Sequence, residues 1–162
     1  MQRRHLLTIL SASLAGCGFE LRREPELLFR SLALSGIAPD SAMAAELRRQ
    51  LSRTAVVLME DANKAELVLV VLRDVRERSA VVSTTAGQVR EWQLRLNFDF
   101  MLRTPNDELL LPRTELRMVR EMNFRETDAL GKEQEEAQLF RAMQSDAVAQ
   151  VMRRLAAVRL PS

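Results

Sequence analysis

Cys17 is the only cysteine in this 162-residue chain, and its position suggests one particular chemistry. It ends the tetrapeptide at residues 14–17, which closes a short apolar run that follows Arg3 and Arg4. A thiolate is a strong nucleophile, so a single thiol at the end of such a leader can take up a lipid chain. We therefore predict that Cys17 is a lipid attachment site and the first residue of the mature protein.

Residues 1–16 have the features of a signal peptide. Their apolar stretch, Leu6 to Ala15, has about ten residues, whereas a helix that spans a bilayer needs about twenty. The small residues before Cys17 resemble a bacterial lipobox; the alternative is a buried helix that happens to carry a cysteine. Gly18 stands where an Asp would indicate retention at the inner membrane. We expect a protein anchored by its acyl chains on the periplasmic side of the outer membrane.

The net charge of the chain comes from this leader. The sequence has 24 Lys and Arg against 22 Asp and Glu, and the leader contributes Arg3 and Arg4 but no acid. Its removal leaves 22 residues of each sign and a formal charge of zero. Binding to nucleic acid depends on an excess of positive charge, so we expect no nucleic-acid partner.

Catalytic chemistry finds few candidate residues. The only histidine is His5, which lies in the leader, and Cys17 is expected to be acylated. The mature chain therefore lacks the residues for His-dependent triads, Cys–His pairs and the usual zinc ligand sets. Glu135 and Glu136 are adjacent on a predicted helix and point in different directions. We predict no enzyme, no metal and no cofactor.

The elements that would position any binding residues are mainly strands. Residues 92–102 alternate strictly, with apolar side chains at Trp92, Leu94, Leu96, Phe98, Phe100 and Leu102. Residues 109–124 form the returning strand, and an apolar run at 67–72 starts a strand that continues to Val82. Two shorter strands are indicated at 31–34 and 55–59. One polar and one apolar face per strand predict an antiparallel meander that is covered on one side.

Two helices complete the prediction. The first begins at Asp40 or Ser41 and ends near Arg53, with Met43, Leu47 and Leu51 on one face and Glu46, Arg49 and Gln50 on the other. The second runs from about Lys132 to about Val158, and its apolar residues, such as Met143, Ala147 and Val151, recur at spacings of three and four and predict a buried stripe. The predicted fold is α+β, a two-layer sandwich with two helices on one face of a roughly four-stranded, largely antiparallel sheet. We assign residues 17–29 to a lipidated tether and 30–160 to one domain.

Three segments resemble the LPS-assembly lipoprotein family (LptE). The segment at 16–22 is similar to the family's opening Gly-Cys-Gly, aromatic, any residue, Leu-Arg. Residues 90–94 resemble its Glu-Tyr-x-Leu segment, with Trp92 in place of Tyr. Residues 129–133 resemble its Ala-Leu-Ala-Lys-acid motif, with Gly131 in place of the second Ala. The order of the segments matches the family across most of the chain.

The resemblance implies a non-enzymatic protein that forms a heterodimer with the LptD β-barrel, plugs its lumen, helps it assemble and assists lipopolysaccharide delivery. It implies lipopolysaccharide contact at Lys132, the motif lysine. Arg90, Arg78 and Arg125 are further candidates, because phosphates favour arginine; ordinary solvated charges or internal ion pairs are the alternative for each. Two other functions stay open: an accessory lipoprotein of another envelope machine, and a lipoprotein that binds a hydrophobic ligand.

Overall fold

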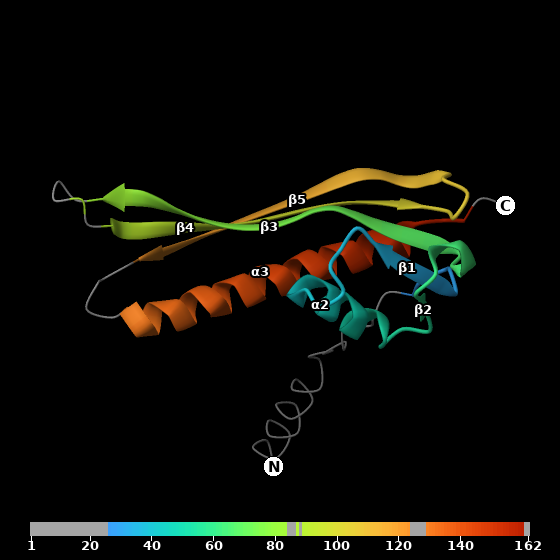
Figure 1. Ribbon diagram of the computed structural model, residues 1–162, viewed down its shortest axis with the longest axis horizontal. Helices are drawn as coiled ribbons and strands as arrows, with labels where there is room; N and C mark the ends of the chain where they lie inside the picture. Colours follow the sequence, from blue (N-terminus) through green and yellow to red (C-terminus); the bar gives the residue numbers. More distant parts are fainter. Residues whose placement is uncertain (1–25, 84–86, 88, 124–128, 161–162) are drawn as a thin grey trace, which may run out of the picture.

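The computed structural model describes residues 26–83, 87, 89–123 and 129–160, which form a five-stranded sheet with two α-helices on one face (Figure 1). We call this face inner and the opposite face outer. Cys17 and Arg125 lie outside the described residues. The strands are β1 (Ser31–Ser35), β2 (Val57–Met59), β3 (Leu67–Ser83), β4 (Val89–Arg103) and β5 (Leu109–Asn123). The helices are α2 (Ala42–Leu51), α3 (Ala129–Ala157) and the short 3-10 helix η2 (Ala62–Lys64).

The sheet is mixed, in the order β2-β1-β3-β4-β5. The α+β class and the two covering helices are confirmed, but the prediction of roughly four largely antiparallel strands needs correction. Strand β1 pairs in parallel with both β2 and β3, while β3, β4 and β5 form the antiparallel meander. Parallel neighbours need a long crossover, and α2 provides it between β1 and β2. The weak pattern at 55–59 is thus a fifth strand, at the sheet edge.

The core lies between the inner face and the two helices, where the sequence patterns place it. The inner-face side chains of β4 from Leu94 to Leu102 are buried, and so is the apolar stripe of α3. Met43, Leu47 and Leu51 of α2 complete the same cluster. The methionines Met43, Met118 and Met143 fill this core.

The helix ends refine the prediction in two places. Ser41 caps α2, because its Oγ accepts the backbone N–H of Ala44 at 3.1 Å. Helix α3 begins at Ala129, before the predicted start at Lys132, so Lys132 lies in its first turn.

Glu46, which the sequence places on the face of α2 opposite its apolar residues, is buried in the structure. Glu46 is only 6% exposed, because α3 packs beside α2. Its carboxylate forms an ion pair with Arg49 and accepts a hydrogen bond from Gln50 at 3.1 Å. A buried carboxylate is tolerated when it is paired in this way.

Candidate functional site

The inner face of β3 changes character halfway along the strand. Up to Val71 its inner-face residues are buried and apolar, and a register shift between Val71 and Arg73 follows. Beyond the shift, Asp74, Arg76 and Arg78 lie opposite the core residues of β4 and so share the inner face. Helix α2 covers only the half of the sheet near β1, whereas α3 and the β3–β4 pair continue beyond it (Figure 1). The polar half of β3 therefore faces α3 alone.

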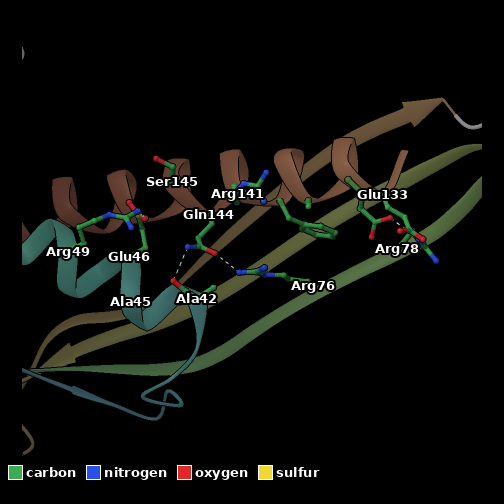
Figure 2. A pocket seen from close by; sticks show the side chains of 13 residues that line it. Ala42, Ala45, Glu46, Arg49, Arg76, Arg78, Glu133, Arg141, Gln144 and Ser145 are labelled. Carbon is green, nitrogen blue, oxygen red and sulfur yellow. Dashed lines mark hydrogen bonds and ion pairs between the residues drawn. The ribbon is translucent and has the colours of Figure 1, made fainter. Parts of the chain in front are cut away.

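An open groove of about 820 Å³ lies between β3 and α3, next to the start of α2 (Figure 2). Strand β3 contributes Arg76 and Arg78, and the start of α2 contributes Ala42 and Ala45. The α3 side is lined by Glu133, Glu136, Ala137, Phe140, Arg141, Gln144 and Ser145. The small side chains keep the groove open, and the arginines line its length.

Both groove arginines of β3 combine a polar contact with an aromatic one. The guanidinium of Arg78 lies 4.5 Å from the centroid of the Trp92 ring and donates to Glu136 Oε2 at 2.7 Å. Arg76 lies 5.8 Å from the centroid of the Phe140 ring and donates to Gln144 Oε1. Such stacking orients the guanidinium plane and stabilises a cation beside apolar surface.

Gln144 connects three elements, α3, β3 and α2, within the groove. It is buried, accepts from Arg76 of β3, and donates its Nε2 to the backbone oxygen of Ala42 at 2.9 Å. Close by on β3, burial raises the pKa of Asp74 above its ordinary value, and Arg76 opposes this shift. The groove thus has a fixed polar wall rather than a deformable apolar one.

Of the predicted binding residues, Arg78 lines the groove, whereas Lys132 does not line it but directly precedes Glu133, which does. Lys132 lies one helical turn before Glu136, the partner of Arg78, and its Nζ pairs with Glu135 Oε2 at 2.6 Å. The Lys132 side chain is only 19% exposed. Arg90 lies near the start of β4, two residues before Trp92, and has an interaction partner of its own.

Arg76 and Phe140 were not predicted as part of a site. Their shared position depends on the register shift in β3, which turns Arg76 toward α3. The only available sequence signal was the spacing of Asp74, Arg76 and Arg78 at alternate positions, which places three charges on one face of a strand.

The groove holds features for binding an anionic ligand. Among residues 26–160, wherever the structure describes them, no group of three or more His, Cys, Asp and Glu could hold a metal ion. In the same residues, no helix has both the length and the apolar character needed to cross a membrane. Arginines beside aromatic rings suit an anionic ligand that also presents apolar surface.

Comparisons with known proteins agree with the resemblance in sequence. A family model, LptE, described as lipopolysaccharide-assembly, matches residues 29–155. The solution structure of an uncharacterized lipoprotein B from Nitrosomonas europaea is similar, with 28% identity, a TM-score of 0.73, and coverage of 86% of this chain and 91% of that chain.

Two crystal structures share the fold. A minor lipoprotein from Acinetobacter baumannii is 23% identical, with a TM-score of 0.66 and coverage of 83% of this chain and 99% of that chain. The rare lipoprotein B from Shewanella oneidensis is 22% identical, with a TM-score of 0.64 and coverage of 79% and 95%. A search of curated proteins found no match. Because the family model spans both helices and all five strands, the chain belongs to the LptE family of lipopolysaccharide-assembly proteins.

Proposed function

We propose that this protein is a non-enzymatic outer-membrane lipoprotein that forms a complex with the LptD β-barrel, plugs and helps assemble it, and assists lipopolysaccharide delivery to the outer leaflet. The observation that carries the proposal is the family match over residues 29–155, which supports a role in lipopolysaccharide assembly. The protein would act by occupying the barrel lumen and by making complementary contacts with the barrel, without covalent chemistry.

The lipid anchor belongs to the same proposal. Cys17 would carry the acyl chains, and residues 18–29 would connect them to the first strand. The similarity to other lipoproteins supports this anchor. Two or three acyl chains hold a protein stably at a membrane, whereas a single chain gives only reversible binding.

Lipopolysaccharide contact is proposed at Lys132, Arg78, Arg90 and Arg125. Support comes from Arg78, which lines a groove with arginines and aromatic rings, and from Lys132, which lies one helical turn before Glu136, the partner of Arg78. The ligand's phosphates would replace Glu135 and Glu136 as partners of these two cations. A guanidinium can offer two parallel N–H donors to a phosphate, which favours this exchange at Arg78.

The two alternative functions differ in what they require. A carrier of a small hydrophobic ligand needs an apolar cavity, but the groove is lined by several charged side chains, and the core between sheet and helices is filled. An accessory lipoprotein of another envelope machine would share the anchor but bind a different barrel. Only the family match separates that alternative from our proposal.

The decisive experiment is a detergent pull-down of the tagged full-length protein from its native outer membrane, followed by mass spectrometry. We expect stoichiometric recovery of one large β-barrel, the lipopolysaccharide translocon. Recovery of the lipoprotein alone, or with another barrel, would reject the proposed complex.

A further inference from the structure

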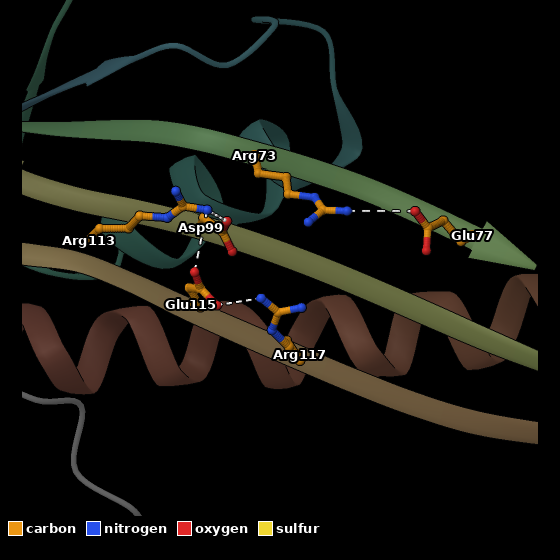
Figure 3. Close-up of polar contacts among 6 residues, drawn as sticks. All are labelled: Arg73, Glu77, Asp99, Arg113, Glu115 and Arg117. Atoms are coloured by element: carbon orange, nitrogen blue, oxygen red, sulfur yellow. Dashed lines mark hydrogen bonds and ion pairs between the residues drawn. The ribbon is translucent and has the colours of Figure 1, made fainter.

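The outer face of the meander carries a compact network of charged side chains (Figure 3). It consists of Arg73 and Glu77 on β3, Asp99 on β4, and Arg113, Glu115 and Arg117 on β5. Helix η2 covers the outer face only near β1, around Ala33 and Val68. Over β4 and β5, Figure 1 shows no described helix or strand on this side.

Asp99 is the centre of the network and is incompletely hydrogen-bonded. It is 1% exposed although it lies on the uncovered face, because neighbouring long side chains bury it. Its Oδ2 accepts from Arg113 Nη2 at 2.6 Å, but its buried Oδ1 has no donor among the described residues. An unpaired buried carboxylate oxygen is costly, and native proteins rarely leave one.

The directly opposed residues do not satisfy this oxygen. Arg73 lies opposite Asp99 on β3, yet its guanidinium is directed to Glu77, with a separation of 3.7 Å. Glu115 lies opposite on β5 and is itself an acid. The network therefore places two carboxylates side by side and keeps one acceptor without a donor, an arrangement that isolated sheet surfaces avoid.

The arginines around Asp99 keep donors available for a partner. Glu115 accepts from Arg117 at 2.5 Å and lies 3.4 Å from Arg113 Nη2, and these contacts lower the pKa of its carboxyl. The side chains of Arg113 and Arg117 are still 57% and 59% exposed. Each guanidinium has five N–H donors, so both can make additional hydrogen bonds.

We propose that this outer-face network is a docking surface for a protein partner whose side chains accept from the exposed arginines around Asp99 and donate to the exposed carboxylates of Glu77 and Glu115. The inference rests on the proposed function, which makes the polar inner wall of a β-barrel the partner. The inward-facing residues of such barrels are polar. The six charges of the network balance, so a polyanion gains no net attraction there, whereas a polar protein wall can match an alternating pattern.

A charge swap tests this surface with little effect on the fold. The double variant Glu115→Arg/Arg117→Glu keeps the ion pair, the side-chain lengths and the net charge, and it places an arginine opposite Asp99. It reverses the pattern that a partner would meet. The matched control is Arg120→Asp/Asp146→Arg, which swaps an exposed pair, 3.4 Å apart, between β5 and α3.

Both variants are expressed as full-length lipoproteins, checked for folding by circular dichroism, and used in the detergent pull-down. We expect the outer-face swap to reduce recovery of the barrel at least about tenfold and the control to recover as much as the wild type. A photo-reactive amino acid at Val119, an exposed outer-face residue of β5, should form an adduct with the same barrel.

Full recovery with the folded outer-face swap would overturn the inference and leave the proposed complex intact. Equal loss in both variants would also overturn it, because the contact would not be specific to this face. If the wild-type protein recovers no barrel, the proposed complex and this inference both fail.

Discussion

Reversing the charge of Lys132 should test its proposed role in ligand binding with little effect on folding. Lys132 pairs with Glu135 at 2.6 Å, and both are on the same helix. Loss of such a pair, and the like-charge repulsion that replaces it, cost together about 1 kcal/mol. Because α3 begins at Ala129, the new carboxylate lies in the first turn, where the helix dipole stabilises it by about 0.3–1 kcal/mol. We expect the free energy of unfolding of Lys132→Glu to stay within about 1 kcal/mol of the wild type.

The effect on lipopolysaccharide affinity should be larger than the effect on folding. The variant replaces an attraction to a ligand phosphate with a repulsion beside Arg78, and we expect the dissociation constant to rise at least about tenfold, or about 1.4 kcal/mol. The assay is binding of purified lipopolysaccharide to the full-length lipoprotein in detergent, at two salt concentrations because screening weakens such contacts.

Lys64→Glu is the matched control for this assay. Lys64 is the other lysine of the chain, and it also pairs with an acid three residues away, Asp61, at 3.7 Å. It lies on η2, away from the groove, and we expect its affinity to change less than about twofold. Unchanged binding by folded Lys132→Glu, or equal losses in both variants, would refute the role of Lys132.

Three further predictions concern the anchor and the fold. Cys17→Ala should abolish metabolic labelling by palmitate and release the protein from membranes; persistent labelling would reject the lipid site. Gly36→Ala should lower the free energy of unfolding by about 2 kcal/mol or more, because Gly36 has a φ of +72° and a Cβ there would lie 2.3 Å from the Val71 backbone oxygen. A denaturant melt with an unchanged midpoint would contradict this close approach of Gly36 to Val71. Asp74→Asn should raise the free energy of unfolding at neutral pH, because burial raises the pKa of this carboxyl and the wild type loses stability as pH rises through that pKa. The advantage should disappear below the ordinary pKa of 3.8. Denaturant melts in which the variant and the wild type differ equally at all pH values would contradict this prediction.

Much of the local structure was predictable because local periodicity is a property of the sequence. Alternation from Leu94 to Leu102 identified the inner face of β4, and the three- and four-residue spacing of Met143, Ala147 and Val151 identified the buried stripe of α3. The order of motifs around Lys132 also predicted the family that the family model confirms.

The register and neighbours of the strands came only from the tertiary structure. The parallel pairing of β1 with both β2 and β3 makes the sheet mixed, and the pairing of β1 with β2 depends on how α2 crosses between them. The groove exists because α2 covers only part of β3. The extent of this cover cannot be obtained from the residue spacing within either element.

The amino-acid sequence alone thus predicted the anchor at Cys17, and it determined the faces of the long strands and of α3 and the family resemblance. Tertiary structure decided that Arg76 faces Phe140, that Glu46 is buried against α3, and that Asp99 is buried on an uncovered face. The physical reason is that periodicity follows from the bonds between neighbouring residues. Burial of a charge, in contrast, depends on side chains from distant segments, which meet only when strand register and helix packing are complete.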